Sequence, residues 1–357
     1  MPSAKRLKYN LTVARFLIAG VLLASVVTWA QTPRADSQGA QLGVAAEHLQ
    51  QGHPDQTITE VKRVLAADPR SAPAHMLLGL AYVALGSPTR IADAKAELQQ
   101  ALDIDPELLW ARFYLARLYF DQGLSEKAQE QLERGLKQSP GLPHFLSLLG
   151  EVRRELGDPA ASVELNRKAI EAGVTVTPAH YFLALAYVDL KQEQAAIAEF
   201  EKAIRSPDAT PEMYNALASL YIKKQRFAEA EGLCRKAISL DPSRPDAYLN
   251  LARVYNAQHA SDKALEALRA ALPEGKEFPA TEYYRGLQAD LAVERGAAYT
   301  AKKMYAPAIG EYVRALDLDP RRAAIHRRLA ELYLRNGDRA SAALHTKEAD
   351  ELEKGQR

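Results

Sequence analysis

The chain has 357 residues, of which 47% are hydrophobic and 25% are charged. This is the composition of a folded protein and not of a disordered one. Lysine and arginine together number 46 against 45 aspartates and glutamates, so no overall charge attracts the chain to phosphate backbones or anionic surfaces. The balance argues against nucleic acid as a partner.

The first thirty residues differ in kind from the rest. Basic residues at positions 5, 6, 8 and 15 precede the uncharged stretch FLIAGVLLASVVTWA at residues 16–30. A basic region followed by an apolar one is typical of an export signal. Fifteen helical residues span about 22 Å, less than the hydrocarbon core of about 30 Å. We therefore expect residues 1–30 to be a signal peptide cleaved near Ala30, with an uncleaved N-terminal membrane anchor as the alternative.

In both cases the residues after 30 are exported. The protein is thus expected to be periplasmic or otherwise extracytoplasmic, with a membrane tether through residues 11–30 if the segment is retained. Residues 31–37 are interpreted as a linker. The single cysteine, Cys234, allows neither an internal disulfide nor a lipid-anchoring cysteine near the apolar stretch. We expect it to be a small buried apolar residue.

A short apolar pattern recurs along the remaining chain. It reads LGLAYVAL from residue 78, LARLYFDQ from 115, LALAYVDL from 183, LASLYIKK from 217, LARVYNAQ from 251 and LAELYLRN from 329. Weaker copies begin at residues 149 and 295, and a period of 34 residues relates most of the copies. Repetition at this period is the sequence signature of stacked helical hairpins.

Each period divides into two amphipathic stretches. In residues 109–142 apolar residues cluster in the first stretch, GLS at 123–125 interrupts it, and Ala128, Leu132 and Leu136 follow at intervals of four. Asp-Pro pairs close four of the periods, at residues 68–69, 105–106, 241–242 and 319–320. Because proline disfavours the α conformation at the preceding residue, the second helix is expected to end there.

Small residues recur at fixed positions of the period. Position 8 is alanine or glycine in every copy, from Ala45 to Ala330, and positions 20 and 27 are alanine in most copies. A larger side chain would separate the paired helices or overpack their seam, at a cost of about 1–3 kcal/mol. We interpret these residues as structural.

These features together resemble the tetratricopeptide repeat (TPR) family, with leucine, a small residue and tyrosine in the first helix, then two alanines and a closing proline. The resemblance implies an all-α fold, a right-handed superhelical TPR solenoid of antiparallel helix pairs, here preceded by the signal or anchor segment. It covers residues 38–356 as about nine repeats: 38–71, 72–108, 109–142, 143–176, 177–210, 211–244, 245–288, 289–322 and 323–356.

Repeat 7 is ten residues longer than the period, around FPATEYYRGL at residues 278–287. We expect this insertion to lengthen the first helix of repeat 8. It either presents Tyr283 and Tyr284 to a partner or uses them to cover an otherwise exposed seam.

The sequence has no constellation typical of an enzyme. It contains no nucleotide-binding glycine motif, no C-x-x-C and no H-E-x-x-H. His75, His180 and His326 share position 4 of repeats 2, 5 and 9, which are expected to lie several repeats apart, so a shared metal is not expected. We therefore predict a non-catalytic protein without cofactor or metal.

In TPR proteins the first helices line a concave groove, which positions 2, 5, 9, 12 and 13 face. This placement comes from the resemblance. Those positions give an apolar and aromatic half that also holds two arginines, and a polar half. The candidate partner-binding residues are Met76, Trp110, Phe113, Arg117, Phe120, Arg154 and Tyr181 in the first half, and Asn215, Ser219, Arg253 and Asn256 in the second.

We expect a peptide or protein partner whose apolar side chains enter the first half while amides of the second bond to its backbone. For Phe113 and Tyr181, packing between neighbouring first helices is an equal alternative. The predicted function is a protein–protein interaction scaffold of the cell envelope, serving a pilus, secretion or polysaccharide-export machine by family analogy. The alternative is a carbohydrate-binding or enzyme-accessory module, in which Trp110, Phe113 and Tyr181 stack on sugar rings.

Overall fold

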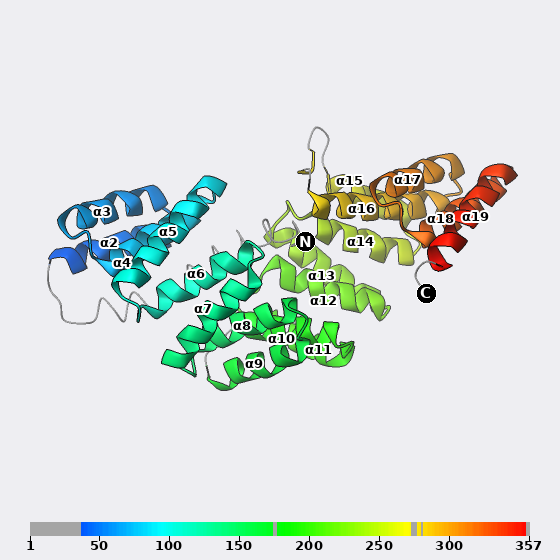
Figure 1. The fold of residues 1–357 in the computed structure, drawn as a ribbon. Coiled ribbons are helices and arrows are strands. Elements are labelled where there is room, and N and C mark those ends of the chain that lie inside the picture. The colour runs from blue at the N-terminus through cyan, green and yellow to red at the C-terminus, as the bar shows by residue number, and fades with distance from the viewer. Residues whose placement is uncertain (1–36, 174–176, 273–276, 280, 355–357) are drawn as a thin grey trace. The chain divides into compact units, whose positions relative to one another are not determined.

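The fold is entirely helical in the part of the chain that the structure describes (Figure 1). A computed structural model describes residues 37–173, 177–272, 277–279 and 281–354. Eighteen helices, α2 to α19, follow one another there, which confirms the predicted all-α fold. The expected signal or anchor segment at residues 1–30 lies outside the described residues.

Consecutive helices pair as hairpins with short loops. The first helices of the pairs are α2 (Ser37–Gln50), α4 (Ala72–Leu85), α6 (Leu109–Asp121), α8 (Pro143–Glu155), α10 (Thr177–Asp189), α12 (Pro211–Lys223), α14 (Pro245–Ala257), α16 (Glu282–Ala301) and α18 (Ala323–Arg335). The second helices are α3 (Pro54–Ala67), α5 (Pro88–Ile104), α7 (Ser125–Gln138), α9 (Pro159–Glu171), α11 (Glu193–Ala203), α13 (Phe227–Leu240), α15 (Ser261–Ala270), α17 (Tyr305–Leu318) and α19 (Arg339–Lys354).

The loop of each described hairpin contains one residue with left-handed backbone, at φ between 59° and 88°. In the loop after α6, the amides of Gly123 and Leu124 donate to the carbonyls of Phe120 and Tyr119, both at 2.9 Å. This is the Schellman arrangement, which satisfies the last carbonyls of a helix. Five of these residues are glycines and four are not: Gly52, Gly86, Gly123, Gly157 and Gly337, and Lys191, Gln225, His259 and Lys303.

Four second helices end where the Asp-Pro pairs predict. Asp68, Asp105, Asp241 and Asp319 directly follow α3, α5, α13 and α17, and each is extended, with ψ between 90° and 95°. The following proline disfavours the α conformation at each aspartate, so the helix ends there.

The small residues at position 8 lie where the two helices of a hairpin touch. A Cβ added to Gly296 of α16 would lie 2.9 Å from the ring of Tyr312 on α17, and one added to Gly79 would lie 2.9 Å from Leu98 Cγ. Ala116, at the same position of its repeat, is completely buried. The structural interpretation of these residues is thereby confirmed.

The insertion in repeat 7 lengthens the first helix of the next hairpin, as predicted. Helix α16 has 20 residues, whereas α14 and α18 have 13 each. Before it, the ring of Phe278 stacks on that of Tyr284, with ring centres 5.3 Å apart. Tyr283 and Tyr284 are partly buried against the core around Leu287 and Leu291, which fits the seam-covering alternative.

The chain divides into two compact units, residues 1–199 and 200–357, with the boundary inside α11. The first unit has a core that includes Leu98, Leu115 and Phe145, and the second has cores around Leu268 and Leu329. Of the described helices, none combines the length and apolar character needed to cross a membrane.

Candidate partner-binding site

The predicted site residues all lie on first helices. Those of the first unit are Met76 on α4, Trp110, Phe113, Arg117 and Phe120 on α6, Arg154 on α8 and Tyr181 on α10. Those of the second unit are Asn215 and Ser219 on α12, and Arg253 and Asn256 on α14. Their role in binding remains a prediction, and their surroundings differ between the two units.

The apolar candidates of the first unit are mostly buried. Met76, Phe113, Phe120 and Tyr181 are at most 7% exposed. A partner could reach these side chains only if neighbouring helices separated. The burial of Phe113 and Tyr181 therefore fits the alternative in which they pack neighbouring first helices together.

Trp110 is half-buried at the edge of an aromatic cluster. Its ring lies 5.7 Å from that of Phe113 and 5.6 Å from that of His144 on α8, both in edge-to-face geometry. Phe113 in turn lies 5.3 Å from Phe145. Burial lowers the pKa of His144, so this imidazole is neutral at pH 7 and behaves as part of the apolar cluster.

The two arginines of the first unit bridge consecutive first helices. Arg117 on α6 donates to Asp121 at 2.9 Å and lies 3.5 Å from Glu151 on α8. Arg154 on α8 donates to Asp189 of α10 at 2.9 Å. Burial lowers the pKa of Arg117, but Asp121 and Glu151 outweigh it and leave that pKa raised. Both guanidiniums therefore remain charged and compensated.

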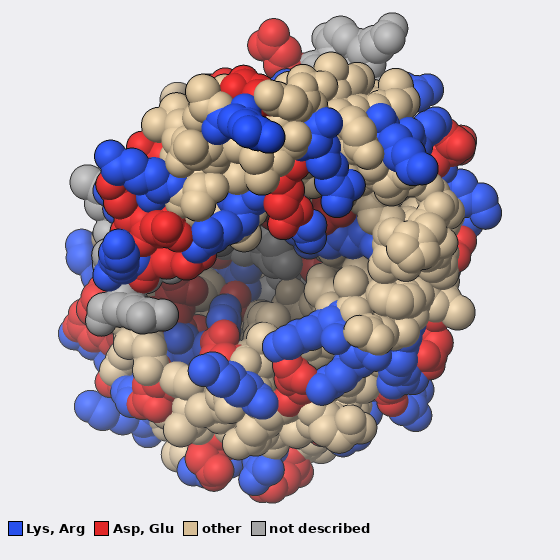
Figure 2. Space-filling view, turned by 90° about the vertical axis from the view of Figure 1, so that its right-hand side faces the viewer, with Lys and Arg blue, Asp and Glu red and all other residues tan. Residues whose placement is uncertain are grey.

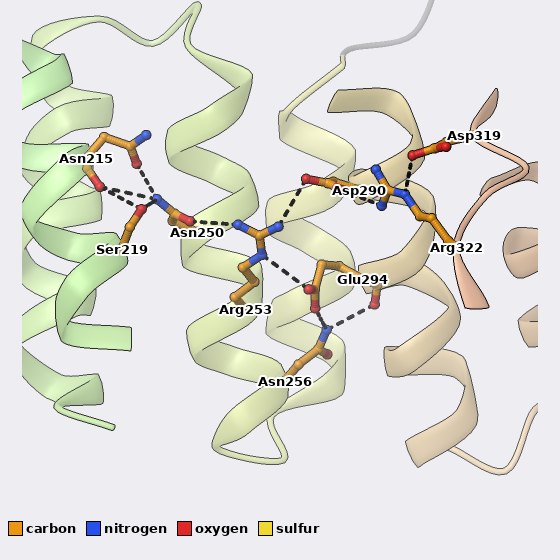
Figure 3. Close-up of polar contacts among 9 residues, drawn as sticks. All are labelled: Asn215, Ser219, Asn250, Arg253, Asn256, Asp290, Glu294, Asp319 and Arg322. Atoms are coloured by element: carbon orange, nitrogen blue, oxygen red, sulfur yellow. Dashed lines mark hydrogen bonds and ion pairs between the residues drawn. The ribbon is translucent and has the colours of Figure 1, made fainter. Parts of the chain in front are cut away.

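In the second unit, amide and hydroxyl groups connect α12 to α14 (Figure 3). Asn250 Nδ2 donates to Asn215 Oδ1 at 2.7 Å and to Ser219 Oγ at 2.8 Å. Asn215 Nδ2 donates to Asp246 at 3.0 Å. Asn250 is buried, and its bonds satisfy an amide that would otherwise be costly to remove from water. The predicted residues Asn215 and Ser219 thus belong to one network.

Arg253 and Asn256 continue the network from α14 to α16. Arg253 donates to Asp290 at 3.2 Å, to Glu294 at 3.3 Å and to Asn250 Oδ1 at 3.2 Å. Asn256 Nδ2 donates to the side chain of Glu294 at 2.8 Å and to its backbone carbonyl at 3.0 Å. All four predicted residues of the second unit are therefore brought together (Figure 3).

The network reaches the start of α18 through Arg322. This guanidinium donates to Asp290 at 2.5 Å and to Asp319 at 2.6 Å. Burial lowers the pKa of Arg322, but its bonds to Asp319 and Asp290 outweigh the burial and leave the pKa raised. We call the residues shown in Figure 3 the polar ladder: Asn215, Ser219, Asn250, Arg253, Asn256, Asp290, Glu294, Asp319 and Arg322.

The contacts of the ladder show that the first helices run in parallel. From α12 to α14, Asn215 contacts Asp246, and Ser219 contacts Asn250, four residues further along both helices. From α14 to α16, Arg253 contacts Asp290 and Asn256 contacts Glu294. A later residue on one helix meets a later residue on the next, so the carboxyl ends of these helices lie at the same edge.

Five members of the ladder are not among the site residues predicted from the sequence. Asp290 occupies position 2, an expected groove position, but the groove positions were assigned only in repeats 2 to 7. Asn250 and Glu294 occupy position 6, Asp319 occupies position 31 and Arg322 occupies position 34, all outside the expected set. The signal that could have found them is charge pairing between neighbouring repeats at a spacing near 34, as in Arg322 with Asp290.

The position-4 histidines bond within their own hairpins. His75 Nδ1 lies 2.6 Å from Glu97, His180 Nδ1 lies 2.7 Å from Glu199, and His326 Nδ1 lies 3.0 Å from His345 Nδ1. Among the described residues, no group of three metal-ligating side chains is placed to hold a metal ion.

Cys234 of α13 is completely buried, as expected of a small apolar residue. Burial raises its pKa to about 12, so this thiol is protonated at pH 7 and is not a reactive nucleophile.

Comparison with known proteins assigns the architecture to a family. Sequence models of the tetratricopeptide repeat match residues 45–108, 87–152, 177–208 and 221–291. A TPR repeat-containing protein of Pseudomonas aeruginosa is 36% identical over 84 residues, which cover 74% of that protein and 24% of this chain. The chain belongs to the tetratricopeptide repeat family. Its described helices fit roughly nine TPR units, as the period predicts.

Longer TPR relatives match more of the chain. Cellulose synthase operon protein C of Pseudomonas fluorescens is 23% identical over 366 residues, covering 86% of this chain and 28% of that protein. Tetratricopeptide repeat protein 5 of Mus musculus is 25% identical over 211 residues, covering 54% of this chain and 48% of that protein. The TPR chain therefore spans less than half the length of either relative.

Solved TPR structures share the fold at low identity. The Cut9–Hcn1 hetero-tetramer of APC/C matches with a TM-score of 0.62 and 17% identity, covering 96% of this chain and 66% of that one. A human IFIT1 dimer matches with a TM-score of 0.57 and 18% identity, covering 89% and 72%. PilF of Pseudomonas aeruginosa matches with a TM-score of 0.50 and 17% identity, covering 59% and 94%. At these identities the similarity concerns the fold alone.

Proposed function

We propose that this TPR chain is a non-catalytic scaffold that binds a peptide or protein partner on its first helices, within an assembly of the cell envelope such as a pilus, secretion or polysaccharide-export machine. The observation that carries the proposal is the polar ladder. It aligns amide, guanidinium and carboxylate groups of parallel helices in a row, and such a row can bond to the backbone of an extended segment.

The envelope assignment has two supports. The order of a basic region and an apolar stretch in residues 1–30 favours export. The name of the Pseudomonas fluorescens relative, cellulose synthase operon protein C, favours an assembly that handles a polysaccharide. That relative is much longer than this chain, so the partner need not be shared.

The accessible residues of the ladder limit the affinity to be expected. Ser219 is exposed, and the side chain of Arg253 is 36% exposed. Their polar groups already have internal partners, so a bound segment would exchange hydrogen bonds and would gain about 1 kcal/mol for each one improved. Binding near the micromolar range or weaker is therefore expected without further contacts.

The proposal is tested by affinity capture with crosslinking from an envelope extract, followed by mass spectrometry. The bait is the full chain, compared with a Ser219→Ala, Arg253→Ala double variant. Lys236→Ala, an exposed residue of α13, is the matched control. We expect one protein to be retained by the wild type and the control and lost by the double variant. Equal recovery with all three baits, or no protein recovered by the wild type, would refute the scaffold role on this face.

Phe113→Ala is unsuitable for this test. The ring is buried among Trp110, Tyr114 and Phe145, and its removal is expected to cost about 3–5 kcal/mol of stability. Loss of capture would then reflect unfolding. The burial of Phe113 and Tyr181 also removes two of the three rings that the carbohydrate-binding alternative requires, because a buried ring cannot stack on a sugar.

A further inference from the structure

The near-zero net charge of the chain hides a local excess of positive charge in the second unit. In repeats 6 to 9, the loop between the two helices and the helix ends that flank it occupy residues 223–229, 257–263, 301–307 and 335–341. They contain eight basic and three acidic residues. We call these four segments the basic loop edge. Its basic members are Lys223, Lys224, Arg226, Lys263, Lys302, Lys303, Arg335 and Arg339.

The same seven positions have the opposite sign in repeats 1 to 5. Residues 50–56, 84–90, 121–127, 155–161 and 189–195 contain three basic and seven acidic residues. Each of these loops contains one left-handed residue, and the loops of repeats 1, 3, 4 and 5 are closed by the same backbone hydrogen bond as those of repeats 6 to 9. Positive charge is therefore not a requirement of the turn, and its concentration in repeats 6 to 9 needs another explanation.

The loops of repeats 6 to 8 lie along one edge of the second unit, because the polar ladder makes α12, α14 and α16 parallel. The fourth loop follows α18, whose start is joined to α16 by the ion pair of Arg322 with Asp290. Lys302 of one loop forms an ion pair with Asp262 of the preceding loop. Packed helix axes are about 8–10 Å apart, so the loops after α12, α14 and α16 are neighbours along this edge. Figure 2 shows lysine and arginine side chains projecting among acidic ones on the face of the molecule turned to the viewer.

Exposed apolar side chains accompany these cations. Met304, inside the third segment, is 42% exposed, and Leu334, directly before the fourth, is 59% exposed. Lys263, Lys303 and Arg339, from the second, third and fourth segments, are also exposed. Cations together with protruding apolar side chains are suited to the interface of a bilayer with anionic headgroups. A nucleic acid or an acidic peptide would be attracted by the cations alone.

We propose that the basic loop edge docks on an anionic lipid surface. Lysine and arginine side chains lie among the headgroups, while Met304 and Leu334 contact the acyl boundary. This inference goes beyond the scaffold role and does not depend on it, because the loop residues differ from the residues of the polar ladder.

Vesicle co-sedimentation of the full chain tests the proposal, with phosphatidylcholine alone and with phosphatidylcholine mixed with phosphatidylglycerol. Any binding through residues 16–30 occurs on both kinds of vesicle, so the measured quantity is the ratio of the two affinities. Each cation near an anionic surface contributes severalfold to binding. We therefore expect a ratio of roughly ten or more for the wild type, and a ratio near one for Lys263→Glu, Lys303→Glu, Arg339→Glu.

The matched control reverses three exposed cations on second helices of the same unit, Lys236→Glu, Arg269→Glu and Arg314→Glu, with the same change in net charge. It should keep the ratio of the wild type. A ratio lost equally in both triple variants would overturn the proposal, as would a wild-type ratio near one.

The apolar side chains are tested separately. The double variant Met304→Ser, Leu334→Ser should weaken binding to the mixed vesicles severalfold. If this variant binds the mixed vesicles as tightly as the wild type does, and the wild type binds polyglutamate as tightly as it binds these vesicles, the edge instead binds an acidic protein.

Discussion

Each hairpin loop has one residue with left-handed backbone, at the same position of the repeat. Glycine adopts positive φ without steric cost, whereas other residues lose about 1–2 kcal/mol there. Gln225 and His259 have φ of 60° and 59°, so their loops are strained relative to those with glycine. The period fixes where the turn must occur, and the residue that occupies it changes the stability of that hairpin.

Exchanging residues at this position should shift stability in both directions. His259→Gly is expected to raise the free energy of unfolding by about 0.5–1 kcal/mol, because the relief of strain exceeds the added entropy of the unfolded chain. Gly157→Ala, at φ 88°, should lower it by about 1–2 kcal/mol. Urea unfolding followed by circular dichroism measures both. Gly43→Ala is the control, since a Cβ there meets nothing within 4 Å in α2, and it should not be destabilising. An unchanged midpoint for Gly157→Ala would contradict the strain argument.

Sequence predicted the residues whose identity the geometry dictates. We predicted the roles of the small residues at position 8 and of the Asp-Pro pairs, because few other residue types fit a close helix contact or end a helix in this way. The left-handed Lys191, Gln225, His259 and Lys303 were not found, since such residues carry no local signal for positive φ. The burial of Phe113 and Tyr181 was left open because a first helix has neighbours on two sides, and the period does not tell which side of the helix a residue faces.

At the scale of elements, Arg244 joins the start of α14 to the start of α12. It forms ion pairs with Glu212 and with Asp246, and the side chain of Glu212 is only 2% exposed. A carboxylate buried to this degree depends on its partner, because removal of one member of a buried pair leaves an uncompensated charge. The exposed pair of Arg235 with Glu231 on α13 offers a comparison within the same unit.

Removal of Arg244 should therefore be far more costly than removal of Arg235. We expect Arg244→Ala to lower the free energy of unfolding by about 3–5 kcal/mol and Arg235→Ala by about 1 kcal/mol or less. Thermal unfolding of the two variants beside the wild type measures the difference. Replacing both members, as in Glu212→Gln, Arg244→Met, should restore part of the loss. Similar midpoints for the two single variants would show that Glu212 does not depend on Arg244.

The last hairpin should be sensitive to acid. Burial lowers the pKa of His345, and nearby His326 lowers it further. The unfolded chain binds this proton near pH 6.5, so below that pH the unfolded state carries more protons than the folded one. The stability of the hairpin of α18 and α19 is therefore complete above about pH 7 and falls as the pH drops below about 6.5.

A single substitution isolates this effect. His345→Glu places a carboxylate opposite His326, as Glu97 stands opposite His75 and Glu199 opposite His180. When the pH is lowered from about 7.5 to about 5, on either side of the ordinary histidine pKa of about 6.5, we expect the midpoint temperature of unfolding to fall less in the variant than in the wild type. His48→Gln, in the first hairpin, serves as the control for a general loss of a histidine. An equal loss in wild type and His345→Glu would exclude the histidine pair as the cause.

At the scale of the molecule, a repeat array is stabilised by each hairpin and its contacts with its neighbours. A local defect is therefore expected to open its own surroundings first.

The period and the composition predicted the family and the number of helices. They did not predict the division into two compact units inside α11, because the 34-residue spacing continues unchanged from repeat 5 to repeat 6. The polar ladder in the second unit and the aromatic cluster in the first depend on side chains at positions where the repeat pattern does not specify the residue type.

Gly296→Ala tests this locality. The added methyl group would meet the ring of Tyr312 at 2.9 Å and should cost about 1–3 kcal/mol. In native-state hydrogen exchange we expect faster exchange in α16, α17 and α18 and no change in α4 to α8. Gly310→Ala on α17, where a Cβ meets nothing within 4 Å, should leave exchange unchanged throughout. Faster exchange in both units would show that the array opens as one cooperative body.

Asp290 accepts from two guanidiniums at once, that of Arg253 on α14 and that of Arg322 at the start of α18. With Glu294 and Asp319, it gives these two guanidiniums three carboxylate partners. Replacing Asp290 by asparagine would remove the excess negative charge, so this part of the first-helix surface would repel acidic segments less. Ligand preference in such an array can thus change at one residue without any change in the path of the backbone.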